Sequence, residues 1–234
     1  MLGIAVLLLT LPSLFRPEGQ PDRQEPARLL AALRQELAEG LRWLRRQPAI
    51  RDVTIAVGVI VAMDAAWFAV LVLYVIHILH QRPGVYGLLV AAGGIGGIGG
   101  IAAGALGPAI TRRLGPWRSL LIAGLVMAAT QAVLGLTANV ITAAAMLAAS
   151  SAAWVLFNMI AVTMRQRQVP DHLLGRITSL CRTVSQGSAA LGALAGGLVA
   201  AITGIRATML IGAIPIAATV ILLNWHHRGT ATSP

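Results

Sequence analysis

The stretch that decides the fold runs from residue 83 to residue 111 and reads PGVYGLLVAAGGIGGIGGIAAGALGPAIT. It carries no charged residue, and Gly96, Gly100 and Gly104 follow one another at intervals of four. Residues 94–99 also form the pattern G-x-G-x-x-G, which is typical of loops that cradle a dinucleotide phosphate. Two interpretations therefore compete: a cofactor loop in an enzyme, or a membrane helix with a closely packed face.

The neighbouring sequence favours the membrane helix. A dinucleotide fingerprint requires an acidic residue about 20 positions after the glycines, yet no Asp or Glu occurs between Asp64 and Asp171. Small residues at intervals of four instead let membrane helices approach closely. We therefore predict that the glycines of this stretch and of a later run pack helix against helix. These glycines are Gly93, Gly96, Gly97, Gly100, Gly104, Gly192 and Gly196.

The composition indicates an integral membrane protein. Of the 234 residues, 57% are hydrophobic and 11% are charged, whereas soluble domains usually carry about 25% charged residues. The 18 basic residues are all arginine, and with eight acidic residues they give a net charge of +10. Arginine at the cytoplasmic side of membrane spans explains this excess, so no nucleic-acid partner is expected. The single cysteine, Cys181, excludes a disulfide framework. No cofactor or metal is expected either.

Six apolar runs are long enough to cross a bilayer, which predicts an all-α membrane protein. The runs cover residues 53–79, 84–111, 118–138, 139–164, 177–203 and 205–225. Residues 1–15 are too short for a full span and are predicted to be part of a membrane helix. Arginine-rich and arginine-poor connections alternate, so the positive-inside rule places residues 16–51, 112–118, 165–176 and the C-terminus in the cytoplasm. We therefore predict a multi-pass protein of the cell (inner or plasma) membrane.

The polar segment 16–51 is predicted to be a cytoplasmic linker that contains an amphipathic helix. Leucines recur at intervals of three and four residues over about 26–47, and eight arginines lie on or beside this pattern. Pro48 is predicted to end the helix. Residues 52–228 then form a half-bundle of six membrane helices, and 229–234 form a C-terminal tail.

The six spans are predicted to form two groups of three. Asp64, Trp67 and Tyr74 share one helix face in the first span, and Trp154 and Asn158 share a face with Ser151 in the fourth. The two glycine-rich runs would then be the middle helices of the two groups. Triplets repeated with inverted topology are typical of transporters, whose pathway lies at the repeat interface.

Asp64 is the sharpest candidate for a functional residue. It lies about 17 Å into its span, where a charged carboxylate is costly and is usually functional or paired. We hypothesise that it alternates between a protonated and a charged form and couples proton entry to substrate exit. The alternative is a structural aspartate that faces the bundle. No second acidic residue lies within the spans, so a paired-carboxylate enzyme site is not expected.

Several other polar residues are candidates with open alternatives. Arg182 either reaches the cytoplasmic surface or contacts an anionic group. Gln186, like Trp154 and Asn158, either lines the substrate pathway or joins neighbouring helices. His226 and His227 are predicted to anchor the last span at the membrane edge.

Three stretches resemble a known family. They are residues 41–48 (LRWLRRQP), 169–177 (VPDHLLGRI) and 107–115 (GPAITRRLG). On these residues the chain resembles the C-terminal half of a major facilitator superfamily transporter, and more narrowly the bacterial exporter branch that includes enterobactin and macrolide efflux proteins. The third stretch is similar to the cytoplasmic gate loop of the superfamily, although Thr111 replaces the acidic residue. The resemblance implies gating roles for Gly107, Arg112 and Arg113.

The resemblance also implies twelve spans with substrate held between two halves. A chain with six spans is then expected to be either a fragment or pseudogene product, or a half-size protein that pairs with a second copy or with an N-terminal half. The implied function is secondary active efflux of a small, drug-like or siderophore-like molecule by alternating access. Coupling to protons is the hypothesis that Asp64 adds to this function. The alternative is a non-transporting membrane interaction or scaffold subunit.

Overall fold

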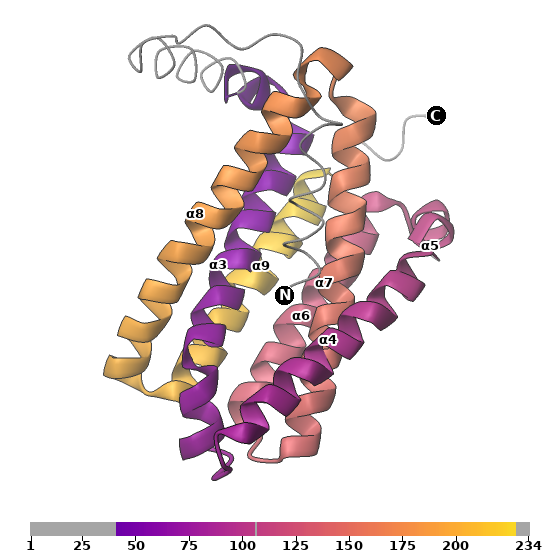
Figure 1. Cartoon of the computed structure of the whole chain (residues 1–234). Coiled ribbons are helices and arrows are strands. Elements are labelled where there is room, and N and C mark those ends of the chain that lie inside the picture. Colours follow the sequence, from indigo (N-terminus) through magenta and orange to yellow (C-terminus); the bar gives the residue numbers. More distant parts are fainter. Residues whose placement is uncertain (1–40, 106, 228–234) are drawn as a thin grey trace, which may run out of the picture. The chain divides into compact units, whose positions relative to one another are not determined.

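The computed structural model describes residues 41–105 and 107–227, and within them the regular secondary structure is helical throughout (Figure 1). Six helices are long and apolar enough to cross a membrane. The prediction of an all-α membrane protein is therefore confirmed. The helices are α3 (Pro48–His77), α4 (Gly84–Ala105), α5 (Gly107–Leu114), α6 (Pro116–Leu136), α7 (Val140–Gln168), α8 (Asp171–Thr203) and α9 (Ile205–His227).

Pro48 was predicted to end the amphipathic helix, and in the structure it is also the first residue of α3. Residues 41–46 are helical, Gln47 interrupts the helix, and Pro48 occupies the first turn of α3. Proline suits this position because its fixed φ matches the helix and its missing N–H has no partner in a first turn. The rest of the predicted amphipathic helix, the partial helix 1–15 and the tail 229–234 lie outside the described residues.

The predicted gate loop is largely a short helix. Residues 107–114 form α5, and Gly115 joins it to α6 with a φ of +78°. The Thr111 hydroxyl donates to the Gly107 carbonyl at 2.8 Å, a bond within α5 itself. The segment predicted as one span over 84–111 is covered by α4 and the first part of α5, and the turn that follows the arginines falls at Gly115.

The two ends of the α7–α8 connection also differ from the prediction. Helix α7 extends to Gln168, and α8 begins at Asp171, six residues before the predicted start. Pro170 precedes the first turn of α8, and the Asp171 carboxylate at that turn complements the positive end of the helix dipole. Polar residues therefore extend both helices beyond their apolar portions.

The packing of the helices has an internal symmetry. The five most extensive contacts join α8 to α3, α3 to α9, α9 to α6, α6 to α7 and α7 to α4. Figure 1 shows this order, with α8 and α3 on one side and α4 and α7 on the other. The set of contacts is unchanged when α3 is exchanged with α7, α4 with α8, and α6 with α9. Helix α3 starts at the arginine-rich end of the bundle and α7 finishes there, so the two triplets have opposite orientations.

Two of the three buried apolar clusters in the described residues fill most of the bundle. One surrounds Ile60 and Phe157 near the arginine-rich end, and the other surrounds Leu71 and Tyr74 towards the opposite end. Asp64 lies in α3 between the residues that belong to the first cluster and those that belong to the second. The acidic side chain therefore occupies a gap in the apolar core.

Candidate functional site

The glycine-rich stretch brings α4 into direct contact with α7. A Cβ atom added to Gly96 would overlap the backbone of Ala148, and one added to Gly100 would lie 2.9 Å from the Cα of Ala152. A Cβ on Gly93 would lie 3.4 Å from the Ser151 hydroxyl. Only glycine permits this approach at Gly96 and Gly100, because any side chain would force the helices apart.

Helix α8 contacts α3 in the same way. A Cβ on Gly192 would overlap the backbone of Ala62, and one on Gly196 would overlap the backbone of Ala66. The pair Gly96 and Gly100 on α4 thus has a counterpart on α8, with the same spacing of four.

Gly97 does not belong to this packing face. Nothing in the described structure lies within 4 Å of a Cβ added there, so Gly97 takes no part in the contact between α4 and α7. Successive helical residues are rotated by about 100°, and Gly97 is therefore turned away from the contact that Gly96 makes. The surroundings of Gly104 lie outside the described part of the structure.

A cavity of about 390 Å³ opens between α3, α4 and α7. It brings together Asp64 and Trp67 from α3 with Trp154 from α7, three residues singled out from the sequence. The indole Nε1–H of Trp67 donates to Asp64 Oδ1 at 2.7 Å. The remaining lining residues are Phe68, Leu71, Leu89, Val90, Gly93, Gly94, Gly97, Leu147, Ser150, Ser151 and Val155.

Local sequence explains how this cavity forms. The spacing of three residues places Trp67 one turn from Asp64, on the same face of α3. On α4, Gly94 and Gly97 have no side chain, and a Cβ atom added to either would have nothing within 4 Å. The glycine-rich stretch therefore packs against α7 along one edge and leaves space beside it. Ser150 was missed because the face of α7 was traced through Ser151, although Ser150 is four residues before Trp154 and lies beside it on the helix.

Other predicted pathway residues lie elsewhere. Tyr74 is fully buried, and its hydroxyl donates to the Thr137 carbonyl at 3.0 Å, which joins α3 to the end of α6. Asn158 on α7 and Arg182 and Gln186 on α8 do not line the cavity. The structure therefore gathers part of the predicted site and separates the rest.

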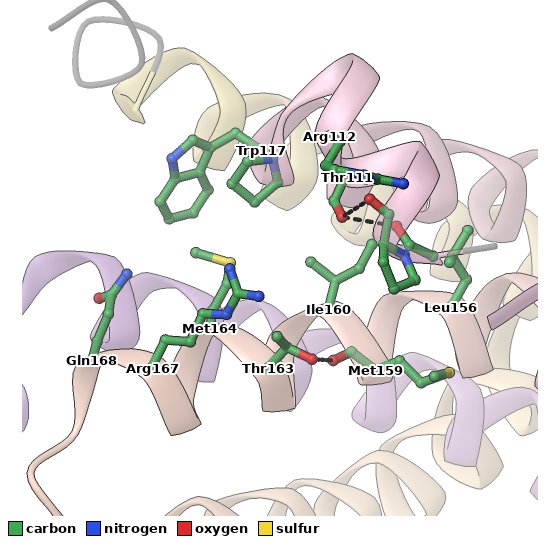
Figure 2. Close-up of a pocket in the computed structure, with 13 residues that line it drawn as sticks. Thr111, Arg112, Trp117, Leu156, Met159, Ile160, Thr163, Met164, Arg167 and Gln168 are labelled. Atoms are coloured by element: carbon green, nitrogen blue, oxygen red, sulfur yellow. Dashed lines mark hydrogen bonds between the residues drawn. The ribbon is translucent and has the colours of Figure 1, made fainter. Parts of the chain in front are cut away.

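A second cavity, of about 650 Å³, lies at the arginine-rich end between α5, α6 and α7. Figure 2 shows Thr111 and Arg112 of α5 opposite Thr163 and Arg167 of α7, with Trp117 of α6 beside them. Gly107 also lines this cavity. Arg113 is exposed and is not among the lining residues, so the two neighbouring arginines have different surroundings.

The fold defines the class of protein. Six apolar helices in two inverted triplets, with an acidic side chain in a cavity at the bundle interior, are the architecture of a multi-pass secondary transporter. A family model described as transmembrane secretion effector matches residues 6–230. The chain belongs to this family, which is of the major facilitator type. A search of curated proteins found no significant match to the chain.

Proposed function

We propose that the chain exports a small molecule by secondary active transport, and that the cavity between α3, α4 and α7 is its binding site. The observation that carries the proposal is the position of Asp64 in that cavity. Asp64 lies sixteen positions after Pro48 and thirteen positions before His77. At ~1.5 Å per residue it lies about 24 Å and 20 Å from the two ends of α3, close to the middle of the membrane.

The lining of the cavity suggests the class of substrate. Trp67, Trp154 and Phe68 present aromatic surface, Ser150 and Ser151 offer hydroxyl groups, and Asp64 is the one acidic residue among the lining residues. Aromatic faces and a carboxylate together attract a cation. We therefore propose a small organic cation with an apolar or aromatic body as the substrate, which is a drug-like molecule.

Asp64 would couple transport to protons by binding one cation at a time. When the carboxylate holds a proton, its attraction for a cationic substrate is lost, and when it is charged it can pair with the substrate. The Trp67 indole at 2.7 Å holds the carboxylate oxygen in place in the charged form. Competition between proton and substrate for one group is sufficient for exchange across the membrane.

Alternating access requires a second unit for this one to move against. Apolar side chains on α4 and α8 are left exposed by the bundle, among them Leu88, Ile95, Leu194 and Leu198. We propose that a second six-helix unit, either another copy of the chain or an N-terminal half, covers this surface, while other exposed faces meet lipid. Arg182 and Gln186 on α8 would then face the pathway between the units, with the arginine-rich end in the cytoplasm.

The test is efflux from proteoliposomes that contain the full chain, with fluorescent organic cations such as ethidium and an imposed proton gradient. Asp64→Asn should abolish gradient-driven efflux, because the amide cannot exchange a proton. Asp171→Asn is the matched control, since Asp171 lies at the exposed start of α8 outside the cavity, and it should retain efflux. Undiminished efflux by Asp64→Asn would contradict the coupling role.

The exposed apolar surface of α4 and α8 also suits the alternative of a non-transporting interaction subunit. In that case the wild-type chain would transport none of the cations but would co-purify with another membrane protein. Substitution of Leu194 and Leu198 by polar residues would then release the partner, whereas Asp64→Asn would not.

A further inference from the structure

Three side chains that commonly bind metals meet where α3 begins and α9 ends. Asp52 lies in the second turn of α3, and His226 and His227 end α9. The Oδ2 atom of Asp52 is 3.1 Å from Nε2 of His227 and 4.0 Å from Nε2 of His226. One ligand atom from each residue lies within 4.8 Å of both others.

The packing around the cluster orients two of the three side chains. Arg51 donates from Nε to Oδ1 of Asp52 at 2.8 Å, which leaves Oδ2 directed at the histidines. The imidazole of His227 is buried and stacks on the indole of Trp117, with ring centres 4.0 Å apart and an interplanar angle of 8°. His226 is exposed. The site therefore has a fixed interior and an open side.

We propose that Asp52, His226 and His227 bind a divalent transition-metal ion, with Zn²⁺ as the first choice. Ligand atoms around tetrahedral zinc are about 3.4 Å apart when the bonds are about 2.1 Å long. The Asp52–His227 pair already has nearly this separation, and rotation of the exposed His226 ring closes the longer one. Two imidazoles and one carboxylate suit Zn²⁺, while Ca²⁺ and Mg²⁺ prefer oxygen ligands alone.

The end of α9 favours a cation beside Asp52, His226 and His227. The carbonyl groups at the end of α9 carry partial negative charge, which attracts positive ions. Arg51 opposes binding by its charge but supports it by orienting Asp52, as hydrogen-bond partners of metal ligands commonly do. A simple ion pair between Asp52 and a protonated His227 would explain the 3.1 Å distance, but it gives no role to the second histidine near the same oxygen.

Metal binding would join the start of α3 to the end of α9, with α6 held through Trp117. The site is distinct from the cavity that contains Asp64, because none of its residues lines that cavity. The inference therefore does not depend on the proposed transport function, and its test does not require a transport assay.

The experiment is a titration of the full chain in detergent, purified without a histidine tag and stripped with a chelator. Co²⁺ should give the visible absorption of a four-coordinate ion with one ion per chain, and Zn²⁺ should displace it. His226→Ala and Asp52→Asn should each weaken binding at least ten-fold, because removal of even the hydrogen-bond partners of metal ligands commonly costs about 10- to 100-fold. The His77→Ala/His80→Ala double variant is the matched control, since His77 is the last residue of α3 and His80 follows it, at the end of α3 opposite to Asp52, and its binding should be unchanged.

A second measurement covers the case in which a variant does not fold. Zn²⁺ should raise the Tm of the wild-type chain but not that of His226→Ala, whose substituted side chain is exposed and contributes little packing. Binding of Zn²⁺ by His226→Ala as tightly as by the wild-type chain would overturn the proposal. So would the absence of stoichiometric binding by the wild-type chain.

Discussion

The contact between α4 and α7 leads to a quantitative prediction for Gly96→Ala. The added methyl group would overlap the backbone of Ala148, so the two helices must separate along this edge. Overpacking of this kind costs about 1–3 kcal/mol. Alanine also has a higher helix propensity than glycine, and this difference stabilises the folded state by about 0.5–1 kcal/mol. The net loss in free energy of unfolding should be about 0–2.5 kcal/mol.

Gly99→Ala separates these two contributions. Gly99 lies in the same helix, has nothing within 4 Å of an added Cβ atom, and is absent from the lining of the Asp64 cavity. It should gain the propensity contribution without a clash. The difference between the variants therefore isolates the steric cost, and we expect it to be about 1–3 kcal/mol.

The assay is reversible unfolding in mixed micelles with an increasing fraction of denaturing detergent, followed by tryptophan fluorescence. The same comparison applies to α8, where Gly192→Ala should be destabilising and Gly197→Ala should not, since nothing lies within 4 Å of a Cβ added at Gly197. Equal stabilities of Gly96→Ala and Gly99→Ala would refute the assignment of the close approach to the glycine face.

Three further predictions concern single residues. Tyr74→Phe removes the hydrogen bond to the Thr137 carbonyl and should lower the free energy of unfolding by about 0.6–1.5 kcal/mol, measured by the same unfolding assay. Gly115→Ala places a side chain at a φ of +78° and a ψ of 158°, a conformation adopted almost only by glycine, and should cost about 1–3 kcal/mol; no loss of stability would show that the α5–α6 turn adopts another conformation. Cys181 is buried beside the Thr54 hydroxyl, 3.4 Å from its sulfur, so a thiol reagent should label it slowly in the folded chain and rapidly after unfolding; equal rates would contradict its burial.

Local spacing was enough to predict the glycine faces. A helix of uncharged residues with glycine at intervals of four has one edge where a second backbone fits, and Gly96 and Gly192 both lie on such an edge. Spacing alone did not distinguish Gly96 from its neighbour Gly97, because the sequence contains glycine on more than one face of α4. The position of α7 in the folded bundle decides which face of α4 it contacts.

The contacts between helices determine how the two triplets align. Alignment of Trp67 with Trp154 would place Asp64 opposite Ser151, whereas the glycine contacts make Ala62 equivalent to Ala148 and therefore pair Asp64 with Ser150. A shift of one position rotates a side chain by about 100° around its helix. Backbone contacts determine the register of the repeat more directly than a few shared polar residue types do.

The Asp52 cluster was beyond the reach of sequence reasoning. Asp52 and His227 are 175 positions apart, and neither has a motif around it that indicates a metal. They meet because α3 and α9 pack together, with the start of α3 beside the end of α9. The prediction that His226 and His227 only anchor the last span used their position in the chain and had no information about this neighbour.

Two helices of the first triplet have their principal packing partners in the second triplet, and this has a consequence for biosynthesis. Helix α3 packs most extensively on α8, and α4 packs on α7, so the first triplet leaves the ribosome before either principal partner has been made. The surface of α3 around Ala62 and Ala66 and the surface of α4 around Gly96 and Gly100 must then face lipid, or be shielded by the insertion machinery, until the second triplet has been inserted. A nascent chain halted after α6 should consequently be a substrate for membrane quality control, because its three helices are complete but lack the surfaces that hold them together.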